Sequence, residues 1–230
     1  MQLEDFKEGQ LLLIDKPLTW SSFNAVNKIK WAILKKYKLK KIKVGHAGTL
    51  DPLATGLLLI CTGKFTKKIQ DLQGQIKEYT GTITLGGSTP SYDLETEVDQ
   101  TFETAHITED LIKETTHQFI GDIMQYPPVF SALKKDGKRL YEFAREGEQV
   151  EIQPRQITIN TFEITEIRFP EVDFRVVCSK GTYIRSLAHD FGKALNSGGH
   201  LSALRRTKIG DYSVEDAISP EEFVANLNEL

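Results

Sequence analysis

The segment from residue 45 to residue 61 constrains the fold more than any other part of the chain. Its first part, GHAGTLDPLATG, holds three glycines, one histidine and one acid, and its second part, LLLIC, is an unbroken apolar run. A short apolar run of this kind is typical of a buried strand. Glycine lets the backbone approach a ligand closely, and Pro52 disfavours the helical region for Asp51. The segment therefore predicts a loop that presents Asp51 beside a buried strand.

The pair Asp51-Pro52 has a second interpretation. Asp at an N-cap and Pro at the first helical position also begin helices, and Gly, Asp and Pro are ordinary turn residues. From residue types alone, this structural interpretation is favoured over a functional one.

The chain is long enough for a full hydrophobic core. Its 230 residues, 40% hydrophobic and 27% charged, suit one large domain or two closely joined halves. We see no apolar run long enough to span a bilayer, and the N-terminal MQLED does not resemble a signal peptide. We therefore expect a cytoplasmic protein with no membrane partner.

The cysteines and histidines do not predict a metal site. Cys61 and Cys178 each lie in an apolar run, where a buried, reduced thiol is the default. The five histidines are scattered and match no zinc-binding spacing. We expect no metal and no disulfide.

Positive charge is concentrated just before the loop. The net charge of −3 argues against a uniformly basic protein, but it hides a one-signed run. This run contains no acid and consists of Lys28, Lys30, Lys35, Lys36, Lys38, Lys40, Lys41 and Lys43. A solvated helix face is the ordinary interpretation. Because the run leads into the 45–56 loop, where a phosphate backbone would find a favourable field, we favour contact with RNA.

The remaining pattern predicts alternating short strands and helices. Residues 10–16 predict a buried strand that ends at Pro17, and Ser21 or Ser22 can cap a helix that runs to Tyr37. The other predicted elements are strands at 57–61, 77–86 and 172–178, a pair of strands within 155–169, a hairpin centred on 135–138, and helices at 64–72, 108–120, 141–147, 182–195 (capped by Thr182) and from 219 onward.

Several motifs resemble one known family. The segment GHAGTLDPLATG closely resembles the active-site motif of the TruB family of tRNA pseudouridine synthases. Four further segments resemble sequence motifs of the same family: DKP followed by WSS near the N-terminus, KEY at 77–79, residues 125–141 and CSKGTYIR at 178–185. The resemblance covers essentially the whole chain.

The resemblance implies a fold and a domain organisation. It implies the α+β pseudouridine synthase catalytic fold, a long mixed, mainly antiparallel sheet with flanking helices and a central cleft. The many short strands and helices read above are compatible with this. Many family members continue into a C-terminal RNA-binding module of the PUA type, for which this sequence has no room. We therefore expect residues 1–230 to form the catalytic domain alone.

The same resemblance assigns catalytic roles. Asp51 matches the catalytic Asp, Tyr79 the tyrosine beneath the target base, and Arg185 an arginine that pairs with the Asp. Without the resemblance, Tyr79 is a half-buried strand aromatic. Arg185 falls in the predicted first turn of a helix, where a cation opposes the helix dipole, and such misfits are often functional.

Further residues are expected to contact RNA. His46 is placed to fill the stack that the flipped base leaves, although a surface-loop histidine is the alternative. Leu204 lines the pocket by resemblance and would otherwise be a core residue. The complete expected RNA-binding set is His46, Lys16, Tyr183, Leu204, Lys64 and Arg205.

The implied activity is isomerisation of uridine to pseudouridine at position 55 in the T-loop of tRNA. An isomerisation needs no cofactor, and base chemistry within a folded RNA loop requires the base to be flipped out. Asp51 either forms an adduct at C1′ or C6 or takes a proton from C2′, and the sequence leaves these routes open. The expected partner is the tRNA T-stem-loop, and we expect a monomer.

Two other classes of protein fit parts of the sequence. A non-catalytic RNA-binding or tRNA-folding protein would use the same lysines, but would not need an Asp and an Arg on separate motifs. A carboxylate-based glycosidase normally needs a second acid, and we find no other acid in a comparable loop.

Overall fold

The structure, a computed structural model, describes residues 2–131, 133–135, 137–146, 148 and 150–229. The chain forms two compact units, and each is described by itself. Unit 1 is Met1–Tyr79 with Leu204–Leu230, and unit 2 is Thr80–Ala203. The chain passes from one unit to the other within two strands, β4 (Lys77–Leu85) and β12 (Gly199–Ile209).

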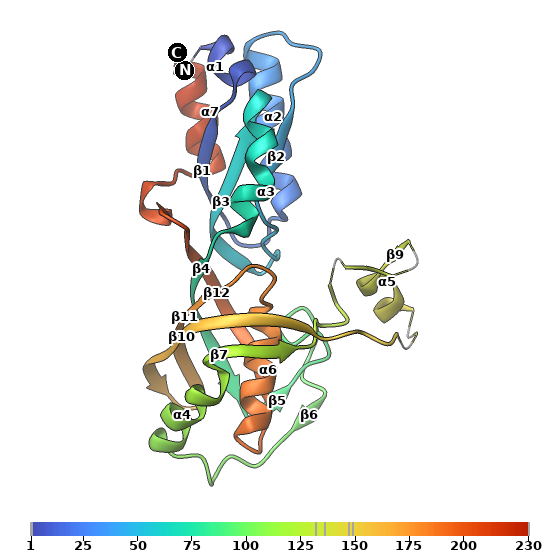
Figure 1. Cartoon of the computed structure of the whole chain (residues 1–230), viewed down its shortest axis with the longest axis vertical. Coiled ribbons are helices and arrows are strands. Elements are labelled where there is room, and N and C mark those ends of the chain that lie inside the picture. The colour runs from blue at the N-terminus through green and yellow to red at the C-terminus, as the bar shows by residue number, and fades with distance from the viewer. Residues whose placement is uncertain (1, 132, 136, 147, 149, 230) are drawn as a thin grey trace. The chain divides into compact units, whose positions relative to one another are not determined.

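Unit 1 is organised around β3, the strand that the apolar run predicted. β3 pairs antiparallel with β1 and β2 and parallel with β12. Helices α1, α2 and α7 lie around β1 and β3 (Figure 1). The elements of unit 1 besides β4 and β12 are α1 (Leu3–Glu8), β1 (Leu11–Lys16), α2 (Ser22–Lys36), β2 (Val44–His46), β3 (Ala54–Thr62), a 3₁₀ helix (Gly63–Lys68), α3 (Ile69–Gly74), β13 (Tyr212–Ser213), a 3₁₀ helix (Val214–Asp216) and α7 (Pro220–Glu229).

Strand β3 is buried on both faces. Leu58 and Ile60 belong to one hydrophobic cluster, which includes residues of α2 and α7. Leu57 and Leu59 belong to a second cluster on the other face, together with residues of α3. A strand covered on both sides reads as a continuous apolar run rather than an alternating one. The burial of Cys61 in the second cluster confirms its predicted environment.

The start of α2 confirms the predicted cap. The Ser21 side chain accepts a hydrogen bond from the Asn24 backbone N–H, which satisfies one of the donors left free at a helix N-terminus. At the other end of the unit, the Ser219 hydroxyl accepts from the Glu222 N–H and Pro220 is the first residue of α7, as Pro at the first helical position predicts.

Unit 2 is organised around β10 and β11. β10 pairs antiparallel with β11 on one side and with β7 on the other, and Phe162 of β10 packs against Phe191 of α6 with ring centroids 5.3 Å apart. The remaining elements of the chain are β5 (Gly87–Ser88), β6 (Gln100–Thr101), α4 (Glu109–Thr115), a 3₁₀ helix (Thr116–Phe119), β7 (Gly121–Gln125), β8 (Lys134–Lys135), β9 (Lys138–Arg139), α5 (Leu140–Arg145), β10 (Arg155–Arg168), β11 (Glu171–Cys178) and α6 (Ile184–Ala194).

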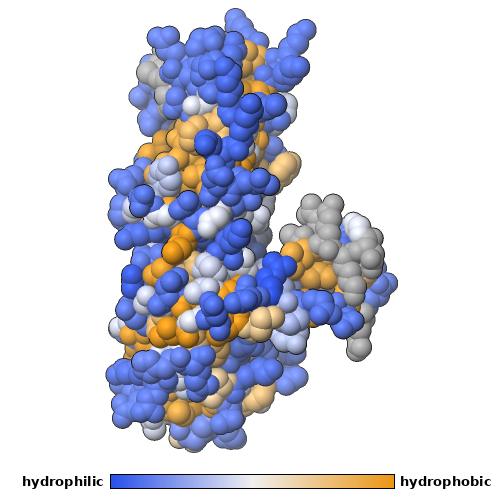
Figure 2. Space-filling model, in the orientation of Figure 1, coloured by the Kyte–Doolittle hydropathy of each residue, from blue (hydrophilic) through white to orange (hydrophobic). Residues whose placement is uncertain are grey.

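The predicted fold class is confirmed. The strand order of the large sheet is β1-β3-β12-β4-β11-β10-β7. β12 and β3 pair parallel, whereas β1 with β3, β10 with β11 and β10 with β7 pair antiparallel. Helices flank this mixed sheet, as an α+β architecture requires. In the described part of the chain we find no helix long and apolar enough to cross a membrane. Hydrophilic side chains predominate on the face drawn in Figure 2, with smaller hydrophobic areas between them.

Two local predictions were wrong, and a third was right in part. Residues 155–168 form one long strand, β10, in place of the predicted pair of strands, and its register against β11 shifts at residues 159–161 and 164–166, as β-bulges allow without ending a strand. The predicted helix at 64–72 is a 3₁₀ helix followed by the short α3. Thr182 does not cap α6, because its hydroxyl donates to the Ser179 carbonyl and Tyr183 occupies the cap position.

The hairpin prediction is confirmed in its pairing. Lys135 pairs with Lys138 and β8 with β9, whereas residue 136 of the turn lies outside the described residues. The helix predicted at 141–147 is α5, Leu140–Arg145, and residue 147 also lies outside them.

Candidate active site

The predicted loop connects β2 to β3 in unit 1. His46 is the last residue of β2, and Ala54 is the first of β3. Residues 51–54 form a turn rather than the start of a helix, closed by a hydrogen bond from the Ala54 N–H to the Asp51 carbonyl. The helix-cap interpretation of Asp51 is therefore wrong. The half-buried Asp51 lies at the turn before a fully packed strand.

Arg206 of β12 binds the backbone on both sides of Asp51. Its guanidinium donates to the carbonyls of Gly48 (3.2 Å) and Thr49 (3.4 Å) before the acid, and to that of Leu57 (2.7 Å) after it. Only 1% of the side chain is exposed. A buried carbonyl without a hydrogen-bond partner is unfavourable. The three carbonyls therefore stay on the Arg206 guanidinium, which fixes the backbone both before and after Asp51.

Lys16 places a second buried positive charge at the loop. Its side chain is fully buried, and its ammonium donates to the carbonyls of Pro17 and Trp20. Burial lowers the pKa of Lys16 to about 8, whereas the nearby Asp51 carboxylate raises this pKa and Arg206 lowers it further. The structure places the charge of Lys16 beside Asp51 and inside the protein. The RNA contact predicted for Lys16 stays a prediction.

The α2 segment holds the other side of the loop. The Ser22 hydroxyl accepts from the Leu50 N–H (2.8 Å) and donates to the Leu50 carbonyl (3.1 Å), and the Thr19 N–H donates to the Pro52 carbonyl (2.8 Å). Both neighbours of Asp51 are thus bonded to one segment. The backbone around the acid is fixed from β12 and from α2.

The surroundings of His46 favour the neutral form of its imidazole. Burial lowers its pKa from the usual value, Arg206 acts in the same direction, and a hydrogen bond with the Gly48 backbone opposes both. Its Nδ1 is buried without a hydrogen-bond partner in this structure. A neutral ring at the start of the loop that carries Asp51 suits stacking between bases.

The other predicted residues of unit 1 lie on β12, on β4 and on the 3₁₀ helix after β3. Leu204 pairs with Ala54 across the parallel β12–β3 ladder, which places it next to the loop, and Tyr79 is buried on β4. Arg205 forms a two-pronged ion pair with Asp15, at 3.1 and 2.7 Å. Lys64 is an exposed surface residue and pairs with Glu8.

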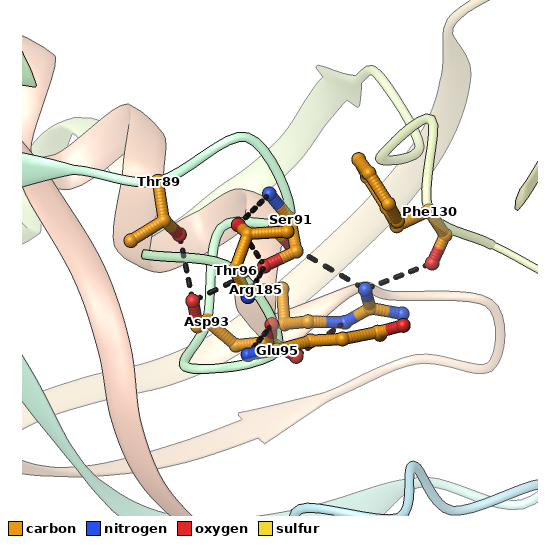
Figure 3. Close-up of polar contacts among 7 residues, drawn as sticks. All are labelled: Thr89, Ser91, Asp93, Glu95, Thr96, Phe130 and Arg185. Atoms are coloured by element: carbon orange, nitrogen blue, oxygen red, sulfur yellow. Dashed lines mark hydrogen bonds and ion pairs between the residues drawn. The ribbon is translucent and has the colours of Figure 1, made fainter. Parts of the chain in front are cut away.

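In unit 2, Arg185 lies on α6 and is held by a polar loop (Figure 3). Its guanidinium donates to the carbonyls of Ser91 (3.3 Å) and Phe130 (2.9 Å), and its Nε lies 3.7 Å from the Asp93 carboxylate. The prediction that Arg185 falls in the first turn of a helix is confirmed. The burial of this cation is compensated by one acid and two carbonyls.

The loop itself is tightly bonded. The Asp93 carboxylate accepts from the Glu95 N–H, and the Asp93 carbonyl accepts from the hydroxyls of Thr89 and Ser91. Tyr92 has a positive φ of 64° and stacks on His189 of α6 with ring centroids 3.9 Å apart. The loop is therefore attached to the helix that carries Arg185.

Tyr183 lies immediately before α6. Its N–H donates to the Gln125 side chain and its carbonyl accepts from the same amide. This fixes the residue two positions before Arg185. Asp51 and Arg185 belong to different units, and their pairing stays a prediction.

Sequence reasoning assigned no positioning role to three residues, Ser22 as a loop anchor, Asp93 and Arg206, although the resemblance placed Arg206 close to the pocket. Adjacent residues of a strand point to opposite faces, so the pair Arg205-Arg206 already implied one surface and one inner arginine. Ser22 was seen only as a cap. In the described part of the chain we find no group of three or more His, Cys, Asp or Glu side chains that could hold a metal.

Comparison with known proteins identifies the class. Residues 35–184 match the family model of the TruB family pseudouridylate synthase N-terminal domain, and residues 185–229 match that of the tRNA pseudouridylate synthase B C-terminal domain. The chain belongs to the TruB family of pseudouridylate synthases, which confirms the resemblance seen in its motifs.

The relatives match over nearly their whole length. A protein of Flavobacterium johnsoniae named tRNA pseudouridine synthase B is 69% identical over 228 residues, which covers 99% of this chain and 100% of that protein. A protein of the same name from Phocaeicola vulgatus is 57% identical over 219 residues, which covers 95% and 93%.

Solved structures share the fold. The chain is similar to one in a Cbf5-Nop10-Gar1 complex, with a TM-score of 0.71 and 31% identity over 98% of this chain and 56% of that one. A chain of an H/ACA RNP bound to a substrate RNA containing 2′-deoxyuridine gives a TM-score of 0.68 and 30% identity, covering 96% and 53%. This chain thus spans a little over half the length of those chains.

Proposed function

We propose that this protein isomerises uridine to pseudouridine in tRNA, at position 55 of the T-loop, with Asp51 as the catalytic carboxylate. The observation that carries the proposal is the loop around Asp51, whose backbone is held by Arg206 before and after the acid and by Ser22 at Leu50. The name of the Flavobacterium johnsoniae relative, 69% identical, supports tRNA as the substrate.

The reaction breaks the bond from N1 of uracil to C1′ of the ribose, turns the base and forms a bond from C5 to C1′. The proton on C5 is released, and N1 gains a proton, so the product is an isomer of the substrate. Asp51 acts at the sugar or the base, by adduct formation at C1′ or C6 or by removal of the C2′ proton. Fixing the loop positions this carboxylate, and misplacement by about 1 Å can reduce the rate about 100-fold.

The other residues bind and orient the RNA. Tyr79 stacks on the flipped uracil, and Arg185 pairs with the Asp51 carboxylate once substrate is bound. His46, a ring kept neutral by burial, fills the stack that the base leaves. Tyr183, Leu204, Lys64, Arg205 and Lys16 complete the proposed RNA-binding set. Because Lys16 is fully buried, its contribution is electrostatic: its ammonium acts on the Asp51 carboxylate.

Two further features belong to this proposal. We propose that residues 1–230 act as one catalytic module built from the two units, and that the module works as a monomer. A tRNA substrate suits the cytoplasm as the place of action.

The proposal is tested with tRNA that carries tritium at C5 of uridine. The wild-type protein is expected to release tritium, and Asp51→Asn is expected to abolish release while tRNA binding stays within about twofold of wild type. The matched control is Asp71→Asn, which changes an exposed acid of α3 paired with Lys68, and it should keep full activity.

Other outcomes identify other classes of protein. Release of free uracil would indicate a glycosidase, and binding without tritium release would indicate an RNA-binding or tRNA-folding protein. Tritium release by Asp51→Asn at the wild-type rate would remove Asp51 from the chemistry.

A further inference from the structure

The exposed side of α2 carries an unusual group of residues. Among the described residues, the two most exposed large hydrophobic side chains are Phe23 (68%) and Trp31 (67%), and both lie on this helix. The exposed residues of α2 form what we call the exposed α2 face: Phe23, Asn24, Lys28, Trp31 and Lys35.

Helical spacing brings the aromatic and basic residues of this face together. Lys28 precedes Trp31 by three residues and Lys35 follows it by four, so both are its neighbours on the helix surface. The opposite side of the helix, with Ile29 and Ile33, is packed in the core. The helix therefore presents Trp31 between two lysines and cannot turn that face inward.

The charge of this region has one sign. No acid occurs between Asp15 and Asp51 in the sequence. Within the described residues, Lys28 and Lys35 form no ion pair with a carboxylate, whereas Lys64, Lys68 and Lys113 elsewhere on the surface each do. The two lysines are about 10 Å apart along the helix. Because no acid neutralises them, the positive field of each extends to about the Debye length, about 8 Å at physiological salt.

The face begins at the catalytic loop. Ser22, the first residue of α2, bonds to both the N–H and the carbonyl of Leu50. A helix of 15 residues is about 22 Å long, so the face extends from the loop by that distance. A polymer bound with one nucleotide at Asp51 has further phosphates and bases within this range.

We propose that the exposed α2 face is a second RNA-binding surface, on which Lys28 and Lys35 contact phosphates and an unpaired base stacks on Trp31. The identity of the RNA as tRNA rests on the proposed function. A single exposed hydrophobic residue is ordinary on a protein surface, and so is a run of lysines. An exposed indole between two unpaired lysines, with no acid nearby, combines the aromatic stacking surface and the positive charge with which proteins bind single-stranded RNA.

The stacking contact is tested by the Kd for unmodified full-length tRNA, measured in an Asp51→Asn background to prevent turnover. Trp31→Ala is expected to raise the Kd about 5- to 150-fold, which corresponds to the loss of one base stack. Trp31→Phe should recover most of the affinity, because it keeps an aromatic face. The matched control is Met124→Ala, which removes another large exposed side chain (60% exposed) from β7.

The phosphate contacts are tested by salt dependence. Removing two phosphate contacts with Lys28→Ala/Lys35→Ala should reduce the slope of log K against log salt by about 1.4–1.8. Lys68→Ala/Lys113→Ala removes the same charge from two exposed lysines that are paired with acids, and its slope should equal that of wild type.

A spectroscopic measurement reports on Trp31 directly. The chain has two tryptophans, so Trp20→Phe leaves Trp31 as the only indole, and its fluorescence should be quenched when tRNA binds. If Trp31→Ala and Lys28→Ala/Lys35→Ala both bind tRNA with wild-type Kd and slope, and the indole is not quenched, the surface does not bind RNA. Failure of the proposed function is distinguishable, because it appears as absent tritium release by the wild-type protein and not in these comparisons.

Discussion

The Nε atom of Arg185 lies 3.7 Å from the Asp93 carboxylate, and both side chains are less than one-tenth exposed. Taking two charges out of water is favourable only when each is compensated. Here the carbonyls of Ser91 and Phe130 complete the coordination of the guanidinium. The loop containing Asp93 therefore determines where the guanidinium of Arg185 lies in unit 2.

Asp93→Asn should reduce stability and activity together. It leaves the buried Arg185 without its acid, and breaking a buried pair typically costs about 3–5 kcal/mol. The measurements are the free energy of unfolding in urea and tritium release from tRNA. The control is Glu163→Gln, which breaks an exposed pair with Arg175 and should cost less than about 1 kcal/mol. Equal unfolding free energies for the two variants would contradict this role of Asp93.

Arg206→Lys should reduce activity more than stability. A lysine keeps the positive charge, but it cannot donate to the carbonyls of Gly48, Thr49 and Leu57 with one planar group. We expect the loop to shift and kcat to fall by about 100-fold, while the protein remains folded by circular dichroism. Arg168→Lys, at an exposed arginine of β10, should leave kcat unchanged. A kcat of Arg206→Lys within twofold of wild type would show that the three contacts do not position Asp51.

Gly56→Ala should destabilise unit 1. Gly56 has a φ of 106°, and an added Cβ would lie 2.3 Å from the Arg206 carbonyl oxygen. Both the backbone conformation and the close approach of β12 exclude a side chain, so we expect a loss of about 2–4 kcal/mol. Gly74→Ala is the control, because nothing lies within 4 Å of a Cβ there. Thermal unfolding of both variants decides the question, and a Gly56→Ala protein as stable as Gly74→Ala would contradict the close approach.

The local parts of the site could be predicted from sequence. Glycine, proline and one acid before an apolar run indicated the loop and β3, and the spacing after Ser21 indicated α2. These signals depend on neighbours in the chain. The family motifs added the roles proposed for Asp51 and Arg185.

The anchors of the site could not be predicted, because they depend on contacts between distant segments. Arg206 reaches the 48–57 backbone through the parallel pairing of β12 with β3, and local patterns do not specify which strands pair. Asp93 lies in the segment GSTPSYD, whose polar turn residues carry no local signal for a contact with α6. Its role requires the loop to contact α6, which the stacking of Tyr92 on His189 provides.

His189→Phe should make the protein less sensitive to mild acid. Burial lowers the pKa of His189 to about 4, and Lys193 acts in the same direction. Between pH 6.5 and pH 4 the unfolded chain therefore binds a proton that the folded chain does not, so stability is complete above pH 6.5 and is lost as the pH falls towards 4. One proton changes the unfolding free energy by at most about 1.4 kcal/mol per pH unit.

Phenylalanine keeps a ring to stack on Tyr92 but does not titrate. We expect the wild-type free energy of unfolding to fall more steeply than that of His189→Phe between pH 6.5 and pH 4, as measured by urea unfolding at half-unit steps. His117→Phe, at an exposed histidine of the 3₁₀ helix after α4, should retain the wild-type slope. If His189→Phe loses stability as steeply as wild type, protonation of His189 is not the cause of the acid sensitivity, and the contact of α6 with the loop containing Asp93 does not depend on it.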